Sequence, residues 1–287
     1  MNYYSMNDYC RETFGKKLYK LSLDGGFTCP VRDGTLGTRG CIFCAAAGAG
    51  EFAARGETLD EQIENAKRRV AHKNKNGGYI AYFQSFTNTY APVQTLREKF
   101  TPVIRRADID VLGIATRPDC LPPETLALLK ELNAVKPVWV ELGLQTVKPE
   151  SAAYIRRGYE NEAFTAAVRE LRQNGIYVIA HIILGLPGET LDDMKNTLRF
   201  ALEAGVNGVK FHLLHVLAGT DLAENWLAGK FQTLTMEEYL RILAALLPML
   251  PPGVAVHRLT GDGRKKDLLS PLWSAEKKQV LNAIKKY

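Results

Sequence analysis

The stretch CPVRDGTLGTRGCIFC, Cys29 to Cys44, places three cysteines in the spacing C-x11-C-x2-C directly after a predicted strand at 18–23. The loop between Cys29 and Cys41 is rich in glycine and charge, and it has no apolar period, so neither a helix nor a core strand is expected there. Clustered thiolates select zinc, copper(I) or an iron–sulfur cluster. A structural zinc site needs four ligands, usually as two close pairs, and only one close pair is present. A 4Fe-4S cluster held by Cys29, Cys41 and Cys44 would keep one iron open for a ligand.

Phe43 lies between the paired cysteines, where its ring could pack on the adenine of a cofactor at the open iron. Further segments extend this pattern: LSLDGGFTCPVRDG, YFQSFTNTY, ATRPDC, ELGLQT, HIILGLPGET and HRLTGDGR. With them, about residues 9–284 resemble radical S-adenosylmethionine (SAM) enzymes of the YtqA/YhcC type (MnmL-like), in the branch related to the Elongator catalytic subunit. The first cysteine gap is longer than in the commonest pattern of these enzymes, C-x3-C-x2-C, and long gaps are expected in this branch. Buried thiols or a redox pair are the alternative interpretation of the cysteines.

Composition describes an ordinary globular protein, with 287 residues, 46% apolar and 24% charged. Five cysteines, an odd and clustered number, do not suggest a disulfide framework and fit a reducing cytosol. The N-terminal residues show no apolar signal region, and no apolar run approaches the roughly 20 residues of a membrane span. We therefore expect a cytoplasmic protein that does not contact a membrane.

The net charge is +6, and the positive excess is concentrated in short runs at 67–75, 156–157, 264–266 and 277–286. A basic surface attracts polyanions and is a hint of nucleic acid. A solvated, solubilising face is the alternative, and the charge alone favours neither.

Strand and helix patterns alternate along the chain at roughly 30-residue spacing, which indicates parallel βαβ units. We expect a single α/β domain over 1–287, a partial (β/α)6 barrel of the TIM type with its core at about 16–219. An extension over 220–287 should carry a helix at 235–247 and a late strand at 254–258. The barrel strands are predicted at 18–23, 79–84, 111–116, 138–145, 177–184 and 209–215, and the helices at 59–74, 93–106, 123–132, 163–174 and 191–204.

Several predicted strands carry polar side chains on one face, because strand residues alternate with a period of two. A solid barrel core would be filled with valine, isoleucine and leucine instead, so the set predicts a pocket at the carboxyl ends of the strands. Each residue taken alone could equally be a hydrogen-bonded polar group near a rim. The set comprises Tyr82, Gln84, Arg117, Glu141, Gly143, Gln145, His181, Lys210 and His212.

The resemblance implies roles for many of these residues around a 4Fe-4S cluster and SAM. Gln84 and Ser85 match positions that hold the methionyl amino group, and Glu141 and Gln145 match ribose-side positions. Arg157 is the best candidate cation for the methionyl carboxylate. The GLPGE turn at 185–189 resembles the segment on which adenine packs. The expected cofactor-binding set is Phe43, Gln84, Ser85, Glu141, Gln145, Arg157, His181, Gly185 and Leu186.

The catalytic candidates are Cys120, Lys210, His212 and Arg117. A substrate carboxylate would need a cation, and Lys210, Arg117 or Arg264 could provide it. His212 could donate a proton, although a histidine on a core strand is more often only hydrogen-bonded. Cys120 is either a thiol hydrogen donor at the cavity or a small buried hydrophobe.

The resemblance also implies a reaction at the tRNA wobble position, in which 5-carboxymethylaminomethyl(-2-thio)uridine becomes 5-aminomethyl(-2-thio)uridine through a 5′-deoxyadenosyl radical. The expected partners are a tRNA anticodon stem-loop, an electron donor such as flavodoxin or ferredoxin, and a downstream tRNA methyltransferase. The alternatives are a radical SAM enzyme acting on another RNA position or a small metabolite, and a non-catalytic Fe-S or zinc protein that binds RNA.

Overall fold

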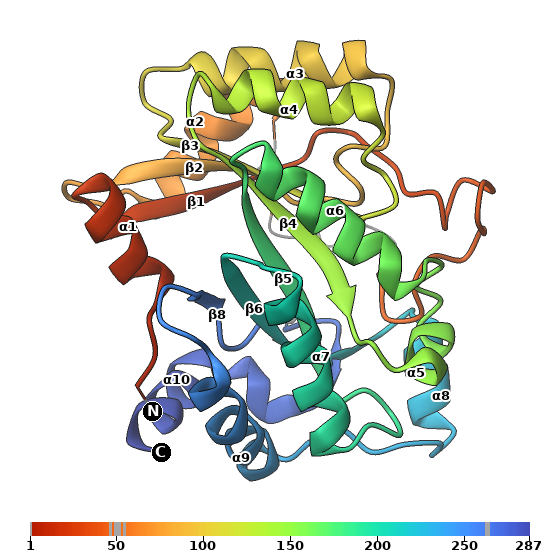
Figure 1. Ribbon diagram of the computed structural model, residues 1–287. Coiled ribbons are helices and arrows are strands. Elements are labelled where there is room, and N and C mark those ends of the chain that lie inside the picture. The colour runs from red at the N-terminus through yellow and green to blue at the C-terminus, as the bar shows by residue number, and fades with distance from the viewer. Residues whose placement is uncertain (1, 46–47, 49–52, 54–55, 262–264) are drawn as a thin grey trace.

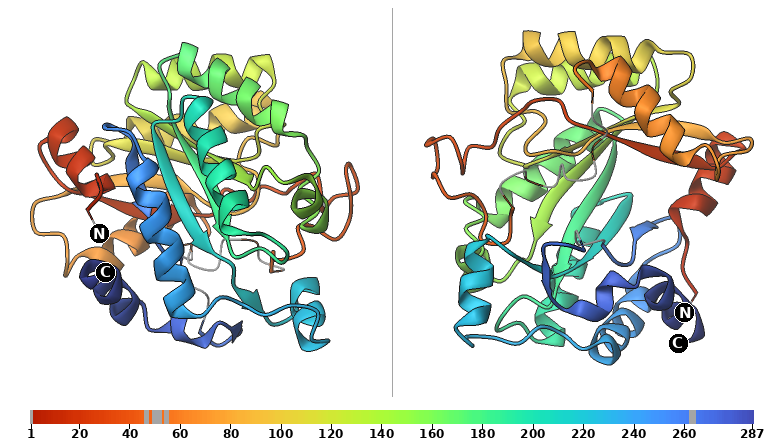
Figure 2. Two further views of the ribbon diagram at one scale, coloured as in Figure 1. Left: turned by 60° about the horizontal axis from the view of Figure 1, so that its bottom comes forward. Right: turned by 180° about the vertical axis from the view of Figure 1, so that it is seen from behind.

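The computed structural model describes residues 2–45, 48, 53, 56–261 and 265–287. Seven parallel strands form one curved sheet in the order β1-β2-β3-β4-β5-β6-β8, with helices on its outer side (Figures 1 and 2). Its elements up to the sixth strand are β1 (Leu18–Leu23), α2 (Leu59–Val70), β2 (Gly78–Phe83), α3 (Val93–Arg105), β3 (Val111–Thr116), α4 (Pro123–Asn133), β4 (Val138–Gln145), α6 (Asn161–Gln173), β5 (Tyr177–Leu184), α7 (Leu191–Glu203) and β6 (Gly208–Leu213).

The predicted α/β partial barrel is confirmed, and β1 to β6 lie within two residues of the predicted strands. The late strand differs from the expectation. It forms β8 (Ala255–Arg258), which pairs in parallel with β6 and adds a seventh strand to the barrel. Pairing with β8 covers the edge that β6 would otherwise expose. The expected extension therefore contributes directly to the barrel.

The remaining elements lie around the rim and along the extension. A two-stranded antiparallel sheet pairs β7 with β9. No described helix has the length and apolar character needed to cross a membrane. These elements are α1 (Met6–Phe14), α5 (Pro149–Tyr154), β7 (Val216–Leu217), α8 (Asp221–Leu227), α9 (Met236–Leu246), β9 (Leu268–Ser270), α10 (Lys277–Lys286) and two 3-10 turns at Leu247–Met249 and Leu272–Ala275.

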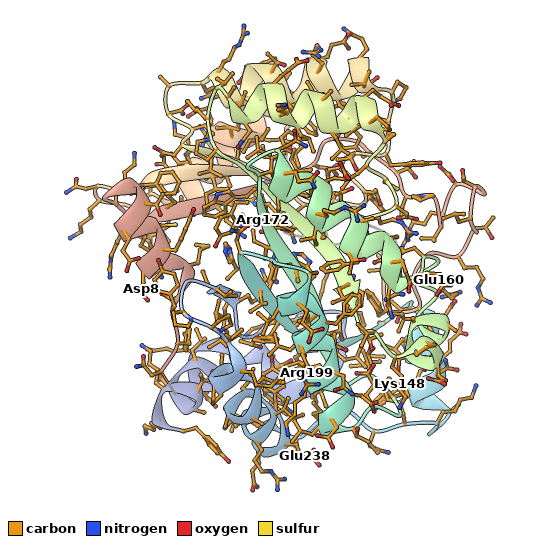
Figure 3. The ribbon with its side chains drawn as sticks, viewed as in Figure 1. Asp8, Lys148, Glu160, Arg172, Arg199 and Glu238 are labelled. Carbon is orange, nitrogen blue, oxygen red and sulfur yellow. The ribbon has the colours of Figure 1, made fainter. Side chains whose placement is uncertain are left out.

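The outer helices are amphipathic and bury one apolar stripe against the sheet. Their polar sides face outward, as the exposed side chains of Arg172 on α6, Arg199 on α7 and Glu238 on α9 show (Figure 3). Beneath α3, Phe100 packs on Phe83 of β2 with ring centroids 4.9 Å apart. The alternate residues of each strand are thereby left to face the barrel interior.

Helix α1, which the sequence analysis did not predict, closes the end of the barrel where the strands begin. The backbone N–H of Val256 in β8 donates to the carbonyl of Tyr4, 2.8 Å away, so the N-terminal segment pairs with the outer edge of β8. Tyr9 of α1 then packs on Tyr177 and Trp139, with ring centroids 4.8 Å and 5.7 Å away. These contacts cover the end of the barrel where the strands begin.

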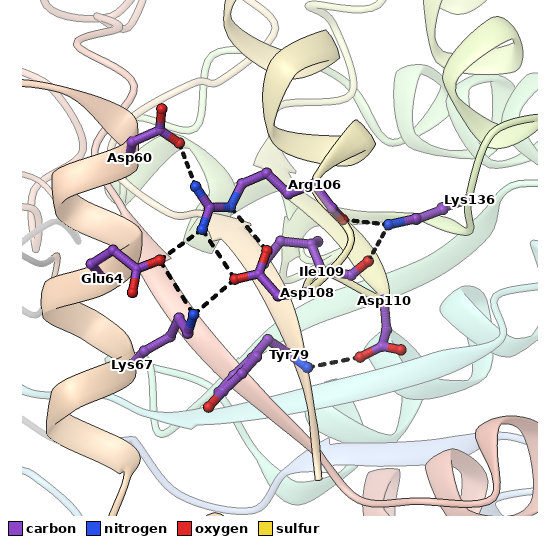
Figure 4. A network of polar contacts seen from close by, with 9 residues as sticks. All are labelled: Asp60, Glu64, Lys67, Tyr79, Arg106, Asp108, Ile109, Asp110 and Lys136. Carbon is purple, nitrogen blue, oxygen red and sulfur yellow. Dashed lines mark hydrogen bonds and ion pairs between the residues drawn. The ribbon is translucent and has the colours of Figure 1, made fainter.

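A network of charged side chains ties α2 to the segment between α3 and β3 (Figure 4). Arg106 bonds to Asp60 at 2.6 Å, Glu64 at 2.7 Å and Asp108 at 3.0 Å. Lys67 contacts Asp108 at 2.8 Å. Hydrogen bonds, from Arg106 first, lower the pKa of Asp108 to about 2. We call these five residues the outer network.

Candidate active site

The cysteine loop after β1 is a series of tight turns held by its own main chain. Arg32 donates from its guanidinium to the carbonyls of Cys44 and Ala45, at 3.0 Å and 2.7 Å. Gly40 has a φ of 69°, and a Cβ there would lie 2.8 Å from Nε of Arg32. A glycine is therefore required for Arg32 to close the loop. The loop lies on the same side of the molecule as α5 and α8 (Figure 1).

Helices α5 and α8 fix this loop against the barrel. The N–H of Ile42 donates to the carbonyl of Ile155 at 3.2 Å, and the N–H of Leu222 donates to the carbonyl of Ile42 at 3.0 Å. Asp221 pairs with Arg156 at 2.6 Å and with Arg39 at 2.8 Å. The hydrogen bond from Arg156 is the main reason that the pKa of Asp221 is lowered. The extension thus helps to position the cysteines.

The three thiols lie close enough to influence one another. Burial raises the pKa of Cys41 to about 12, and the neighbouring Cys44 and Cys29 add to this shift. Thr87 donates its hydroxyl to Sγ of Cys29 at 3.2 Å, as it would to a thiolate. The positive charge of a bound metal centre would offset the repulsion between thiolates and so favour their deprotonated form.

The donor set consists of the thiols of Cys29, Cys41 and Cys44, and thiolates are the usual ligands of iron–sulfur clusters. In the described part of the chain, no group of three or more His, Cys, Asp or Glu side chains is arranged to hold one metal ion. Thiolates that hold a 4Fe-4S cluster bind separate iron atoms, so they stand further apart than the ligands of one zinc ion.

Backbone strain is concentrated around the cysteines. Phe86, Gln145 and Arg156 have φ values of 58°, 65° and 57°, a region that non-glycine residues rarely adopt. Phe86 and Gln145 follow or end strands β2 and β4 at the carboxyl side of the sheet. The carbonyl of Arg156 lies 4.0 Å from Sγ of Cys41. Such strain persists where the surroundings enforce it, and it is typical of functional sites.

The expected amino-group site lies directly after β2. Ser85 is fully buried, and no described residue forms a hydrogen bond with its hydroxyl. The N–H of the preceding Gln84 donates to the carbonyl of Leu23 at 3.2 Å. A buried hydroxyl without a partner is rare and fits a site completed by a ligand.

The GLPGE turn is rigid and lies beside Phe43. Gly185 has a φ of 88°, and a Cβ there would lie 2.7 Å from a methyl group of Leu234. Lys148 donates to the carbonyl of Gly188 at 2.8 Å from the base of α5 (Figure 3). Leu186 and Phe43 belong to one apolar cluster at the mouth of the barrel. These contacts provide an apolar surface of the kind that the resemblance implies for adenine.

Arg157 does not lie free for a carboxylate. It is 3% exposed, and Nη1 donates to the carbonyls of Leu144 and Thr146 at 3.2 Å and 2.6 Å. Its Nε and Nη2 donate to the carbonyl of Tyr159 at 3.0 Å and 2.7 Å. Main-chain carbonyls thus engage the guanidinium that the sequence analysis assigned to the methionyl carboxylate. Arg157 fixes the chain after β4 instead.

Arg117 is engaged in the same way. Its guanidinium makes two bonds to Asp119, at 2.9 Å and 2.7 Å, and a third to the carbonyl of Arg157 at 2.9 Å. The ring of Tyr159 lies between the two arginines, 4.8 Å and 4.7 Å from their guanidinium carbons. These contacts favour a structural role for Arg117 over the predicted contact with substrate.

Cys120 follows β3 and remains a thiol. Burial raises its pKa to about 12, with a smaller contribution from Asp119, whose Oδ1 lies 3.8 Å from the sulfur. The protonated form is the one that could donate a hydrogen atom, so the predicted role of Cys120 stays a prediction.

Strands β1, β2, β4, β5 and β6 bring five polar side chains together in the barrel interior. Glu141, 1% exposed, lies 2.5 Å from Nζ of Lys20, 2.6 Å from Nζ of Lys210, 2.7 Å from the hydroxyl of Tyr82 and 2.6 Å from Nε2 of His181. Burial alone would raise the pKa of Glu141, but Lys20 and Lys210 outweigh it and hold the pKa well below its usual range. We call these five residues the inner network. Three of these contacts are to Oε2, so a ribose hydroxyl would approach Glu141 at Oε1, which contacts Lys20 alone among the described residues.

The histidines of the interior are neutral near pH 7. Burial, followed by the charge of Lys210, lowers the pKa of His181 to about 4. Burial also lowers the pKa of His212 well below its usual value, and the two rings lie 4.8 Å apart. Nε2 of His212 is buried, and it neither donates a hydrogen bond to nor accepts one from any described residue. His212 is therefore available to a ligand, and its predicted proton transfer stays a prediction.

Sequence reasoning missed Lys20 and Thr87. Lys20 could have been found, because the strand LYKLSL alternates Leu21 and Leu23 on the outer face with Lys20 and Ser22 on the other. Thr87 carries no local signal, since its contact with Cys29 depends on how two separate loops meet. Arg264 lies outside the described residues.

Comparison with known proteins agrees with this geometry. Residues 34–201 match the Radical SAM superfamily, and residues 206–287 match the Radical SAM C-terminal domain. The chain belongs to the radical SAM superfamily. It is 46% identical to YtqA of Bacillus subtilis over 99% of this chain and 88% of that protein, which together with YhcC confirms the predicted type.

The Elongator-related branch is also confirmed. A tRNA uridine(34) acetyltransferase of Methanocaldococcus jannaschii is 29% identical over 53% of this chain and 28% of its own length. The solved structure of Elp3 from Methanocaldococcus infernus has the same fold, with a TM-score of 0.69 at 16% identity over 94% of this chain and 63% of that chain. As a radical SAM enzyme, the protein uses a 4Fe-4S cluster and SAM.

Proposed function

We propose that this enzyme converts 5-carboxymethylaminomethyluridine, with or without the 2-thio group, to 5-aminomethyluridine at the tRNA wobble position. The observation that carries the proposal is the buried inner network, in which two lysines face one carboxylate at the centre of the barrel. Burial lowers the pKa of Lys210 well below its usual value, and an anionic substrate group beside it would favour its charged form. The relationship to an enzyme that acts on tRNA uridine 34 supports the same position of the tRNA.

The residues of this chain have distinct tasks in the proposed reaction. Cys29, Cys41 and Cys44 would hold the cluster, and Ser85 would accept a hydrogen bond from the methionyl amino group. When bound, the cluster and SAM would supply a carbon radical that can take a hydrogen atom from the methylene of the carboxymethyl group. Return of one electron from that carbon to the flavodoxin- or ferredoxin-type carrier, followed by hydrolysis of the C=N bond so formed, would release the two-carbon unit as glyoxylate and leave the 5-aminomethyl group. Lys210 would orient the substrate beside Glu141, and the apolar cluster that includes Leu186 would exclude water.

The tRNA would bind mainly through its phosphates, with the target base extruded into the barrel. Exposed lysines of α10, Lys277, Lys278, Lys285 and Lys286, form a basic surface of the kind such binding needs. The run at 156–157 is not part of such a surface, because Arg157 is buried and Arg156 pairs with Asp221. A flavodoxin- or ferredoxin-type electron donor and a downstream methyltransferase complete the proposal.

The test uses anaerobically reconstituted holoenzyme, reduced with dithionite and given SAM with tRNA from cells that lack this gene. We expect 5′-deoxyadenosine together with 5-aminomethyluridine at the wobble position. Deoxyadenosine with unchanged tRNA would overturn the substrate and point to another RNA position or a metabolite. A fully loaded protein that forms no deoxyadenosine would contradict the proposed chemistry.

A further inference from the structure

One row of residues crosses four neighbouring strands on the interior side of the sheet. Gly143 of β4 is in register with His181 of β5, His181 with Lys210 of β6, and Lys210 with Arg258 of β8. Paired strands lie roughly 4.8 Å apart, so Arg258 begins one strand spacing from Lys210. At the other end of the row, Gly143 lies beneath the side chains of Gln145 and Tyr159, 2.7 Å and 3.3 Å from where a Cβ would stand.

A bulge in β8 directs Arg258 into the barrel. Val209 pairs with Val256 and Lys210 pairs with Arg258, so His257 is an extra residue on the β8 side. The ring of His257 lies 5.3 Å from Trp139, at the end of the barrel that α1 covers. Two consecutive strand residues normally point to opposite faces, and a bulge is the device that re-aims one of them. The charge of Arg258 also contributes, after burial and His181, to the lowered pKa of His212.

In the described part of the chain, Arg258 differs from the other cations of the interior because no residue bonds to it. Lys20 and Lys210 bond to Glu141, and Arg117 bonds to Asp119. Among residues 2–45, 48, 53, 56–261 and 265–287, none is in hydrogen-bond or ion-pair contact with the guanidinium of Arg258. The side chain is half-buried, and its Nη1 lies near Gly261, 3.8 Å from where a Cβ would stand. A half-buried charge without an acceptor is unfavourable unless a ligand provides one.

We propose that Arg258 binds the carboxylate of the substrate's carboxymethylamino group and is the main determinant of specificity for it. A guanidinium offers two parallel N–H donors that match the two oxygens of a carboxylate. Lys20 and Lys210 already bond to Glu141, whereas the guanidinium of Arg258 makes no bond to any described residue and can turn its donors to a ligand. This inference rests on the proposed function and adds a binding residue to it.

The test measures binding of two anticodon stem-loops to the reconstituted holoenzyme, by fluorescence anisotropy at fixed salt. One carries 5-carboxymethylaminomethyluridine at the wobble position, and the other carries its methyl ester, which has no charge there. We expect the wild type to bind the acid more tightly than the ester, by roughly 10- to 100-fold. Arg258→Gln should bind the acid about as weakly as the wild type binds the ester, whereas Arg258→Lys should retain part of the preference.

The matched control is Lys286→Gln on α10, which should weaken both stem-loops by the same small factor. Arg258→Gln should keep its iron content and should bind the ester as the wild type does, which shows that the fold is intact. An Arg258→Gln protein that still prefers the acid would overturn the inference while leaving the proposed function standing. A wild type that neither prefers nor converts the acid would overturn both.

Discussion

The inner and outer networks show two uses of charge in one fold. In the outer network, three carboxylates surround Arg106 and Lys67, and every member is partly exposed (Figure 4). In the inner network, one carboxylate pairs with two lysines. Glu141 and Lys210 are 1% and 2% exposed. The outer network has acceptors for each cation and joins helices. The inner network has cations in excess inside a barrel, which is the condition for binding an anion.

The largest effect should come from removing the carboxylate of the inner network. Glu141→Gln leaves Lys20 and Lys210 without a counter-charge in a buried site, so we expect a loss of about 3 to 5 kcal/mol in the free energy of unfolding. Urea unfolding of the apoprotein measures it. A loss below about 1 kcal/mol in the free energy of unfolding would mean that the lysines find other partners. The contrast between the inner and outer networks would then fail.

Lys210→Met should affect activity more than stability. It leaves Glu141 paired with Lys20, so the buried carboxylate keeps a counter-charge and the loss of stability should be small. We expect turnover of the wobble uridine to fall roughly 10- to 100-fold, the value of one charge-assisted hydrogen bond. Melting temperature and product formation, measured on the same preparation, separate the two effects. A variant that unfolds readily but retains full turnover would assign Lys210 a purely structural role.

Asp108→Asn tests the outer network with a carboxylate-to-amide change, as Glu141→Gln tests the inner network. Two of its partners, Lys67 and Arg106, keep Glu64 as an alternative acceptor, so the loss of stability should be only about 1 kcal/mol. Raised salt should shrink the difference, because these charges are screened. Turnover should not change. A loss as large as that of Glu141→Gln would remove the distinction between the networks.

The smallest expected effect is the pH dependence of the contribution that Asp108 makes to stability. Its pKa is lowered to about 2 in the folded protein, whereas about 3.9 is usual for an unfolded chain. Its contribution is therefore complete above pH 4 and is lost as the pH falls toward 2. The stability difference between the wild type and Asp108→Asn should be constant from pH 5 to 7 and should shrink below pH 4. A difference that grows on acidification would contradict the assignment.

The sequence predicted the barrel strands well because their apolar runs are long and evenly spaced, as at Tyr177–Leu184. It could not predict that β8 joins the sheet, since four residues carry too little pattern to reveal a partner. The inner network was accessible through the alternation of Glu141 and His181 on their strands. The contacts of Arg117 and Arg157 could not be predicted for another reason. Their partners are mainly main-chain carbonyls and a nearby aspartate, which composition cannot reveal.

The central claim is that the barrel interior acts on a wobble uridine through its carboxylate. The most direct measurement compares the acid and methyl-ester stem-loops as substrates of the wild-type holoenzyme, with deoxyadenosine and the wobble nucleoside quantified in the same reaction. The account predicts 5-aminomethyluridine in proportion to deoxyadenosine from the acid, and almost none from the ester. Equal conversion of both, or deoxyadenosine with neither RNA changed, would contradict it.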